Sequence, residues 1–281
     1  MILIDYNQIA LSNIIVQKLN DEDLIRHMIL NSIRMYNKKY RNDYGQMVIC
    51  ADGMNTWRKE FFPQYKAHRK KGREESSMDW NEIFRVLNLV REEIKENLPY
   101  KVLHMEGCEA DDVIGALVHN AQEFGNFEPI MIISSDKDFI QLQKFSNVKQ
   151  FSPIQKKVVA DKHPRKYLFE HICRGDKGDG IPNILSPDNC FVDEIRQSPL
   201  KQNLIDTWIG DGYINMPDEI KRNYQRNRKL IDLNEIPQDI YNNIVNTFTG
   251  QKPAMKMKVL NYLIKKRCTN LIEVVEEFYN G

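Results

Sequence analysis

The chain has 281 residues, of which 42% are hydrophobic and 28% are charged. This balance is typical of a soluble globular protein and excludes disordered and membrane-spanning classes, since no apolar run approaches the roughly 20 residues that a bilayer span needs. The apolar start, Met1 to Ile4, is broken at once by Asp5. We therefore expect no secretory signal and a protein that stays in the cytoplasm.

The cysteines and the charges narrow the class of protein further. Five widely scattered cysteines make a disulfide framework or a zinc knuckle improbable. The net charge of +1 taken alone argues against a nucleic-acid partner, but the charges are segregated. Trp57 to Arg73 holds seven basic residues and one acid, and further basic clusters run over 221–229 and 252–267. This separation is compatible with an acidic metal centre inside a basic phosphate-binding rim.

The first third of the chain alternates between strand and helix patterns. A short apolar run ends at Asp5, and apolar residues at helical spacing over 25–36 predict a helix. Residues 47–52 are rich in β-branched side chains and predict a strand. The polar, basic and aperiodic segment 53–79, called the arch below, predicts a long loop over the surface. Apolar residues from Trp80 to Ile94 predict an amphipathic helix that ends near Pro99.

The alternation continues up to about Ser152. Residues 102–105 predict a short strand, 114–121 a helix, and 129–136 a strand covered on both faces. Strands that alternate with helices indicate an α/β fold with a parallel sheet. Beyond Ser152 we find short helical patterns and no convincing strand except 156–160. We therefore predict an α/β core over 1–152 and a mostly helical region over 153–281.

Acidic residues follow several of the predicted strands. Apolar runs end in Asp5, Asp52 and Asp136, and the carboxyl ends of parallel strands share one edge of a sheet. The remaining candidates lie in tight clusters, Glu109-Ala-Asp111-Asp112, Asp136-Lys-Asp138 and Asp176-Lys-Gly-Asp179. Each cluster alone has an ordinary explanation, as a helix N-terminus or a turn. Their joint order along an α/β pattern predicts a shared site.

So many carboxylates cannot crowd together fully ionised without counter-charge. An oxygen-rich site without His or Cys suits Mg²⁺, for which Mn²⁺ can substitute. Two such ions about 4 Å apart stabilise the attacking and the leaving oxygen of a phosphodiester displacement and lower the pKa of bound water from about 15.7 towards neutrality. The sequence therefore predicts metal-assisted hydrolysis without a Ser-His-Asp or Cys-His arrangement.

The ordered motifs resemble a family of 5′-nucleases. They read Leu3-Ile-Asp5, Cys50-Ala-Asp52, Tyr65-Lys-Ala-His-Arg69, Glu109-Ala-Asp-Asp112, Ser134-Ser-Asp-Lys-Asp138 and Gly175-Asp-Lys-Gly-Asp179. The family includes the flap endonucleases, the nuclease domain of bacterial DNA polymerase I and the ribonuclease H of T-even bacteriophages, and the likeness is strongest to the last of these. The resemblance implies a PIN-like core and a helical C-terminal region with a helix-hairpin-helix element. Here that element is degenerate, since only its first glycines are kept.

The resemblance also implies a role for each group of residues. The first metal would be surrounded by Asp5, Asp52, Glu109, Asp111, Asp112 and Asp136, and the second by Asp138, Asp176 and Asp179. Lys66 and Arg69 would stabilise negative charge at the scissile phosphate, and Tyr65 would stack on a base. We also expect nucleic-acid contacts from Arg58, Lys70, Lys71 and Arg73 in the arch. Because the hairpin departs from the family pattern, the grip on the duplex would come instead from Lys201, Lys221, Arg222, Arg226, Arg228 and Lys229. The basic arch also fits a solvated loop that grips phosphates unspecifically.

We therefore expect a magnesium-dependent 5′-nuclease with ribonuclease H, 5′ to 3′ exonuclease and flap endonuclease activity. Its implied task is removal of RNA primers and adjacent DNA during phage lagging-strand replication, as a monomer on DNA and RNA·DNA duplexes with free 5′ ends or flaps. The phage sliding clamp and single-strand-binding protein are the expected partners. Three alternatives stay open, a haloacid-dehalogenase-type phosphatase, a non-catalytic branched-DNA-binding protein and a single-strand ribonuclease of the PIN type.

Overall fold

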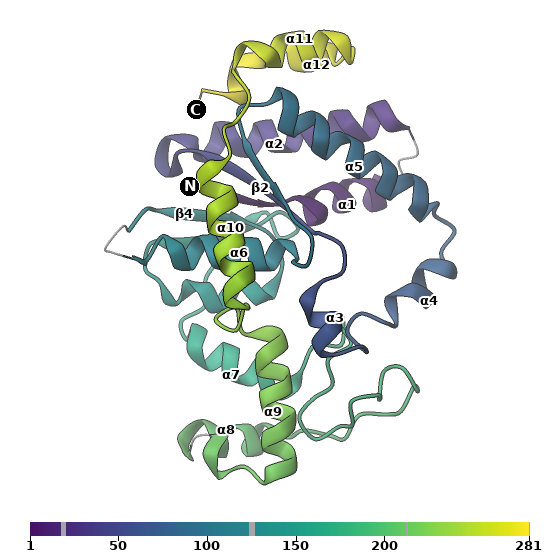
Figure 1. Cartoon of the computed structure of the whole chain (residues 1–281), viewed down its shortest axis with the longest axis vertical. Coiled ribbons are helices and arrows are strands. Elements are labelled where there is room, and N and C mark those ends of the chain that lie inside the picture. Colours follow the sequence, from purple (N-terminus) through teal and green to yellow (C-terminus); the bar gives the residue numbers. More distant parts are fainter. Residues whose placement is uncertain (18–20, 124–126, 212, 281) are drawn as a thin grey trace.

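A six-stranded sheet forms the centre of the computed structural model, which describes residues 1–17, 21–123, 127–211 and 213–280 (Figure 1). The strands are β1 (Ile2–Asp5), β2 (Met47–Ala51), β3 (Lys101–His104), β4 (Ile130–Ile133), β5 (Val148–Ser152) and β6 (Lys157–Val159). Their order is β3-β2-β1-β4-β5-β6. The first five are parallel, and β6 pairs with β5 in antiparallel register. This confirms the predicted α/β fold with a parallel-type sheet.

Helices surround the sheet and continue below it. In chain order they are α1 (Tyr6–Gln17), α2 (Glu22–Tyr44), α3 (Trp57–Phe61), α4 (Arg69–Glu74), α5 (Trp80–Asn97), α6 (Ala110–Asn120), α7 (Pro164–Arg174), α8 (Gln202–Asp211), α9 (Asp218–Ile231), α10 (Gln238–Gly250), α11 (Met257–Lys265) and α12 (Thr269–Ile272). Among the described residues, 3₁₀ helices are η2 (Lys137–Lys144), η3 (Tyr213–Asn215) and η4 (Val275–Phe278). None of the described helices combines the length and the apolarity that crossing a bilayer requires.

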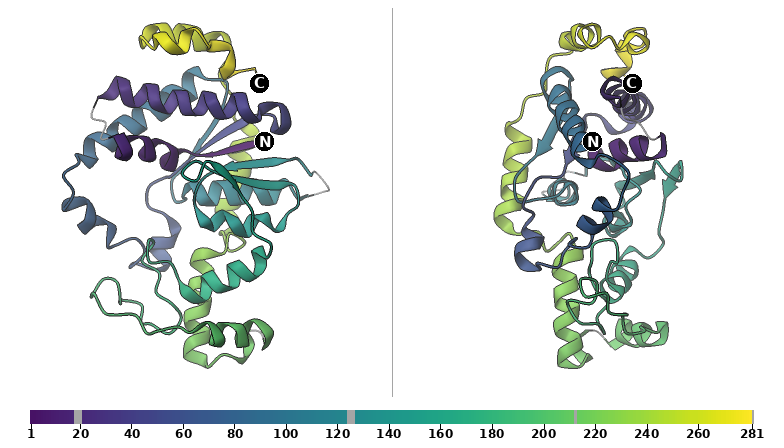
Figure 2. Two further views of the ribbon diagram at one scale, coloured as in Figure 1. Left: turned by 180° about the vertical axis from the view of Figure 1, so that it is seen from behind. Right: turned by 90° about the vertical axis from the view of Figure 1, so that its right-hand side faces the viewer.

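The two faces of the sheet bury separate hydrophobic clusters because strand side chains alternate. Ile2 and Ile4 of β1 belong to the cluster formed with α1, α2 and α5, whereas Leu3 belongs to the cluster formed with α6 and α10. Figures 1 and 2 show how these helices lie against the sheet. All four residues of β1 and all five of β2 are buried. Burial on both sides explains why these strands read as continuous apolar runs.

The long helices of the core begin at capping residues. The Asp21 side chain accepts a hydrogen bond from the Leu24 amide at the start of α2, and Asp79 accepts one from the Glu82 amide at the start of α5. The buried face of α5 carries the apolar periodicity seen in the sequence, from Ile83 to Ile94. The helix ends before Leu98, next to Pro99. The predicted helix over this segment is therefore confirmed.

The second half of the chain does not form one separate core. A third hydrophobic cluster joins α7, α8 and α9 to Phe62 and Tyr65 of the arch. Leu233 and Ile244 instead pack on the α6 face of the sheet, and Val259 and Leu263 of α11 pack on the α2 and α5 face. The C-terminal segment thus returns to the first core (Figure 1). The predicted division of the chain near residue 152 stays a prediction. The hydrophobic clusters themselves contain residues from both sides of that position.

Two elements differ from the expectation. Strand β5 had not been predicted, because its Val-Lys-Gln-Phe-Ser sequence looks polar, but Gln150 is 1% exposed and hydrogen-bonds inside the protein. The arch contains the short helices α3 and α4 and is not a continuous loop. Trp57 and Phe62 at the two ends of α3 are buried, so packing orders a segment that lacks periodicity.

The hairpin after α7 lies where the degenerate helix-hairpin-helix element is predicted, and its match to that element stays a prediction. Asp176 and Ile181 form an isolated antiparallel bridge, and Gly175 adopts a φ of +67°. A Cβ at Gly175 would lie 2.3 Å from the Ile181 carbonyl oxygen, which only glycine avoids. Turns occupy residues 184–185 and 188–194, and the next α-helix begins at Gln202.

The buried ion pair between α2 and α5 gives a stability prediction. Glu93 accepts hydrogen bonds from Arg26 at 2.7 Å and from Tyr262 of α11 at 2.8 Å, and Arg26 is 1% exposed. Removing one partner of a buried pair costs about 3–5 kcal/mol. We expect Glu93→Ala to lower the free energy of unfolding by about 3 kcal/mol in urea titrations. Glu92→Ala, which removes a half-exposed partner of Arg91, is the control and should change it by less than about 1 kcal/mol.

Candidate active site

The acidic site lies at the carboxyl edge of the sheet beside β1. Asp5 ends β1, Asp52 follows β2, and Asp136 comes three residues after the end of β4. Strand β1 lies between β2 and β4, so the chain order reverses on its two sides. Ligands of open α/β sheets bind outside the carboxyl ends of strands at such a switch point.

Asp5 and Asp52 are held by neighbouring side chains and amides. Asp5 is 7% exposed and accepts hydrogen bonds from the Ser134 hydroxyl at 2.9 Å and the Gln8 amide at 3.2 Å. Asp52 is exposed and accepts from the Asn7 side chain and from the Ala110 amide at the start of α6. The carboxylates of β1 and β2 are thereby fixed relative to the helix that carries Asp111.

The loop after β4 is fixed by the strand that the sequence did not reveal. The side-chain amide of Gln150, in β5, donates to the backbone carbonyl oxygens of Ser134 at 3.0 Å and Asp136 at 2.6 Å. The Asp136 side chain in turn accepts from the Asp138 amide at 2.9 Å. Asp136 and Asp138 therefore have defined positions at the start of η2.

Asp111 and Asp112, although adjacent, face different surroundings. The charges of Asp136, Asp5 and Asp138 all act on Asp111. Asp112 is fully buried and instead accepts from Arg58 at 2.8 Å, from the Trp57 indole at 3.3 Å and from the Glu109 amide. The structure thus brings Asp111 to the other acids, whereas Asp112 forms the buried counter-charge of Arg58.

Glu109 connects the acidic site to the arch. It accepts hydrogen bonds from the Lys66 ammonium at 2.7 Å and the Tyr65 hydroxyl at 2.7 Å. Burial raises the pKa of Glu109, but the charges of Lys66 and Arg58 outweigh burial and hold that pKa below its usual value. Lys66 has a φ of +55°, an uncommon conformation for a lysine. The protein therefore keeps a strained residue where its ammonium meets the acids.

Asp179 joins the hairpin after α7 to the same segment of the arch. Its carboxylate accepts from the Tyr65 hydroxyl at 2.9 Å and pairs with Arg69, and the Lys66 ammonium lies 3.6 Å away. The Lys66 amide donates to the Asp179 carbonyl oxygen, and Arg69 donates to the Gly178 carbonyl oxygen. Both predicted catalytic cations thus lie at the edge of the acidic site.

Burial and mutual repulsion shift the acids at the centre of the site. Burial, followed by the charge of Asp52, raises the pKa of Asp5 to about 7. Burial and the charge of Asp136 raise the pKa of Asp138 to about 8. The pKa values of Asp111 and Asp136 are also raised, mainly by burial. These carboxyl groups therefore lack sufficient counter-charge from the described side chains.

The donor set fits divalent cations. Carboxylate oxygens are hard ligands that Mg²⁺ and Mn²⁺ prefer, and the Asp138 Oδ1 atom is buried without a hydrogen-bond partner among the described residues. Crowded acids with raised pKa values are stabilised when cations neutralise them. The residues that would hold such ions are Asp5, Asp52, Asp111, Asp136, Asp138, Asp176 and Asp179.

One residue of the site, His171, had not been predicted. It lies on α7 with its ring between Asp138 and Asp176, and the three side chains offer ligand atoms within 4.8 Å of one another. Burial lowers the pKa of His171, but the hydrogen bond to Asp176 and the charge of Asp138 outweigh it and raise that pKa. Only its position five residues before Asp176 in the sequence hinted at this role.

The expected nucleic-acid contacts of the arch fall into two groups. Arg58 and Tyr65 are 3% and 1% exposed and bind protein groups, so they offer no surface to a nucleic acid in this structure. Lys70, Lys71 and Arg73 are exposed on α4. Lys71 pairs with Glu194 of the turn region after α7, next to which α4 lies in Figure 1.

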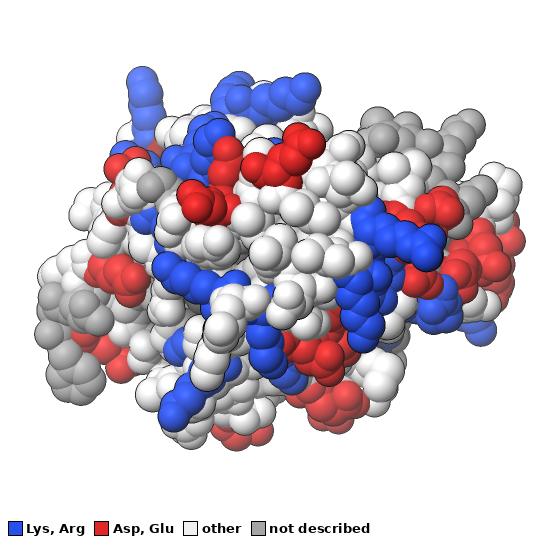
Figure 3. Space-filling view, turned by 90° about the horizontal axis from the view of Figure 1, so that it is seen from above, with Lys and Arg blue, Asp and Glu red and all other residues white. Residues whose placement is uncertain are grey.

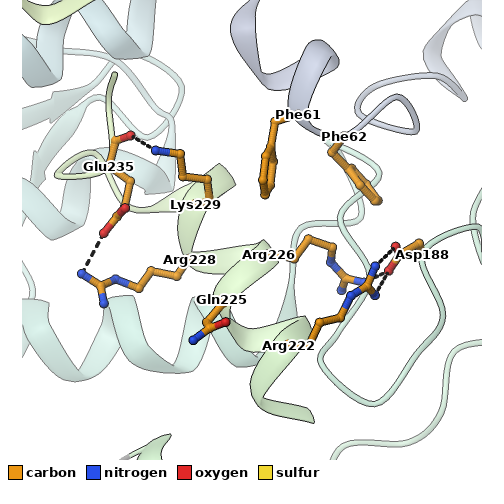
Figure 4. A pocket seen from close by; sticks show the side chains of 9 residues that line it. All are labelled: Phe61, Phe62, Asp188, Arg222, Gln225, Arg226, Arg228, Lys229 and Glu235. Atoms are coloured by element: carbon orange, nitrogen blue, oxygen red, sulfur yellow. Dashed lines mark hydrogen bonds and ion pairs between the residues drawn. The ribbon is translucent and has the colours of Figure 1, made fainter. Parts of the chain in front are cut away.

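The C-terminal basic residues gather around a pocket of about 550 Å³ between α3 and α9. Figure 4 shows Phe61 and Phe62 facing α9, with Lys229 and Arg228 towards one end and Arg222 and Arg226 towards the other. Asp188 pairs with both Arg222 and Arg226, and Glu235 pairs with Arg228. Lys221 is half-buried beside Asp218, and Lys201 is exposed outside this pocket. Much of the positive charge is thus already paired.

The opposite end of the molecule, where α11 and α12 lie, has mixed charges. Figure 3 shows Lys and Arg side chains interspersed with Asp and Glu over that face. The concentration of unneutralised acids described above lies instead at the carboxyl edge of the sheet.

Known proteins are similar to this chain in sequence and in fold. Residues 3–168 match the family described as 5′-3′ exonuclease, N-terminal resolvase-like domain, and residues 165–278 match T4 RNase H, C terminal. The ribonuclease H of Enterobacteria phage T4 is 35% identical over 98% of this chain and 95% of that protein. A 5′-3′ exonuclease of Buchnera aphidicola from Acyrthosiphon pisum is 31% identical over 52% of this chain and 50% of its own length.

Solved structures of bacteriophage T5 proteins have the same fold. A 5′-exonuclease with bound zinc has a TM-score of 0.63 and 16% identity, and covers 89% of this chain and 98% of its own. A T5 flap endonuclease complex with DNA and metal ions has a TM-score of 0.63 and 17% identity, over 88% of this chain and 97% of that one. At these identities the likeness concerns the fold.

The raised pKa values give a pH-dependent stability. A carboxyl group with a higher pKa in the folded state binds more protons when folded, so its ionisation favours unfolding. The stability that protonated Asp138 contributes to the folded state begins to fall above about pH 4 and is lost as the pH rises through about 8. We expect the melting temperature of metal-free protein to fall between pH 5 and pH 8, and Asp138→Asn to raise it at pH 8 by about 3 °C or more.

A surface acid and added cations supply the controls for this measurement. Asp206→Asn, at an exposed position of α8, should leave the pH profile unchanged. Added Mg²⁺ should raise the melting temperature of the unaltered protein at pH 8 more than that of Asp138→Asn. Equal profiles for the two variants would contradict the assignment of repulsion to Asp138.

Proposed function

The chain belongs to the 5′-nuclease family of the phage T4 ribonuclease H and the 5′-3′ exonucleases, and we propose that it hydrolyses DNA and RNA·DNA duplexes from the 5′ side using two Mg²⁺ ions. In this proposal it acts as a 5′ to 3′ exonuclease and as a flap endonuclease. Its task is the removal of RNA primers and adjacent DNA during phage lagging-strand replication.

The convergence of poorly neutralised acids beside two cations carries the proposal. Asp5, Asp111, Asp136 and Asp138 have raised pKa values, and Lys66 and Arg69 lie at the border of the same cluster. A phosphodiester brings negative charge that needs both divalent ions and basic side chains. A structural acid cluster alone would not need exposed basic residues on the neighbouring α4.

Each side chain has a definable task in the reaction. When bound, the ions neutralise the acids and lower the pKa of a water molecule so that it can attack phosphorus. Glu109 and Asp179 orient Lys66 and Arg69, whose charges would stabilise the non-bridging oxygens of the phosphate. Ser134 and Gln150 support this by keeping Asp5 and Asp136 in position.

The names of the relatives support the substrate class. The T4 protein is called ribonuclease H, and the similar T5 flap endonuclease is described in complex with DNA and metal ions. Transferred to this chain, these names favour duplexes that contain DNA in at least one strand. The phage sliding clamp and single-strand-binding protein stay predicted partners, and a monomer stays the predicted state.

Cleavage of a labelled 5′-flap duplex tests the activity. We expect the unaltered chain to release short 5′ products with Mg²⁺ and none with chelator. Asp136→Asn should lower the single-turnover rate by about 1,000-fold, or about 4 kcal/mol, while binding measured without divalent ions is kept. Asp218→Asn, at an exposed position on α9, is the matched control.

Three outcomes would count against this proposal. Binding of the flap by the unaltered chain without cleavage would favour a non-catalytic branched-DNA-binding protein. Undiminished cleavage by Asp136→Asn would place the chemistry outside the acidic site. Equal cleavage of an RNA-primed duplex and of single-stranded RNA would favour the PIN-type ribonuclease.

The salt dependence of binding tests the role of α4. Lys70 and Arg73 are exposed, and each phosphate contact contributes about 0.7–0.9 to the slope of log K against log salt concentration. We expect the double variant Lys70→Ala, Arg73→Ala to reduce this slope by about 1.5 in fluorescence-anisotropy titrations. The control, Lys252→Ala with Lys256→Ala, removes two exposed lysines beyond α10 and should leave it unchanged. Equal slopes for both double variants would rule out α4 as a phosphate contact.

A further inference from the structure

His171 introduces nitrogen into a site that is otherwise built from oxygen. Its ring lies between two acids, with Nδ1 3.3 Å from Asp138 Oδ1 and Nε2 3.4 Å from Asp176 Oδ2. The side chain is 12% exposed, and the Tyr167 ring packs against it at 5.8 Å between ring centroids. The imidazole is therefore held in place by α7 and is not a mobile surface group.

The hydrogen bonds around the ring leave one nitrogen unused. Nε2 lies within hydrogen-bond distance of Asp176 Oδ2. His171 Nδ1 and Asp138 Oδ1 are both buried and have no hydrogen-bond partner in the described part of the chain. Although 3.3 Å apart, these two atoms are thus not aligned as donor and acceptor.

The separation of His171 Nδ1 and Asp138 Oδ1 is typical of two atoms that bind the same metal ion. Ligand atoms at right angles around an octahedral ion, with bonds of about 2.1 Å, lie about 3 Å apart, and their lone pairs converge on the ion instead of on each other. Histidines that bind metals with one nitrogen usually donate the other N–H to a carboxylate, as Nε2 can to Asp176. The arrangement matches both requirements.

We propose that His171 Nδ1 and Asp138 Oδ1 bind the same divalent ion, with Asp176 orienting the imidazole. This inference rests on the proposed function, since it concerns one of the two metal positions. Imidazole is a better ligand for Mn²⁺, Co²⁺ and Zn²⁺ than for Mg²⁺. The position therefore accepts a transition metal more readily than the all-oxygen set around Asp5 and Asp111 does.

Electron spin echo spectroscopy with Mn²⁺ as the probe tests this on the whole chain, because directly bound imidazole nitrogen modulates the echo. We expect nitrogen modulation in the unaltered protein and its loss in His171→Gln. His68→Gln is the matched control, since His68 lies in the neighbouring arch segment but packs on the Phe191 ring, and it should keep the modulation. His171→Gln should also weaken Mn²⁺ binding at this position about 10-fold or more and change Mg²⁺ binding by less than about 3-fold.

Protein labelled with ¹⁵N-histidine keeps the test independent of how any variant folds. The modulation of the unaltered chain should then shift to the ¹⁵N frequencies. Saturable Mn²⁺ binding without histidine modulation would overturn the proposal, as would modulation that survives in folded His171→Gln or disappears in His68→Gln. The result is separable from the proposed function, because nitrogen coordination is read in the absence of substrate, whereas flap cleavage is measured with Mg²⁺.

Discussion

Repulsion between carboxylates confined to one edge of the sheet is the constraint around which the rest of the molecule is organised. Five parallel strands bring Asp5, Asp52 and Asp136 to the same edge. Burial of Asp5 and partial burial of Asp136 then remove much of the solvent that would screen these charges, whereas Asp52 stays exposed. Other elements supply partners: the Lys66 ammonium of the arch contacts Glu109, and the His171 imidazole of α7 lies beside Asp138. Neither side chain neutralises the centre of the cluster, so divalent ions fit there.

The sequence predicted the parts that depend on periodicity and order. Apolar runs that end in acids predicted the sheet edge, because parallel strands have only one arrangement of their carboxyl ends. Strand β5 was missed because a glutamine in a short sequence is usually a surface residue. Gln150 is buried instead, and its side chain hydrogen-bonds to backbone carbonyl oxygens. Contacts of that kind join residues 14 or 16 positions apart and leave no periodic signal.

The roles of single residues were harder to predict than their neighbourhood. Arg58 lies in a basic run, yet it is buried against Asp112, and Tyr65 is buried between two acids. Basic composition does not distinguish a residue that grips phosphates from one that neutralises a buried acid. His171 was missed for the opposite reason, since a single histidine on a helix has many ordinary uses. Tertiary packing decides both cases.

Asp179 is a shared anchor for two side chains of the arch. Its carboxylate holds Arg69 directly, lies 3.6 Å from the Lys66 ammonium, and its carbonyl oxygen accepts from the Lys66 amide. Arg69 depends on this carboxylate directly, whereas Lys66 keeps a second and closer anchor in Glu109 at 2.7 Å. The hairpin after α7 and the arch are thus tied to each other at Asp179, so the position of one segment fixes the position of the other.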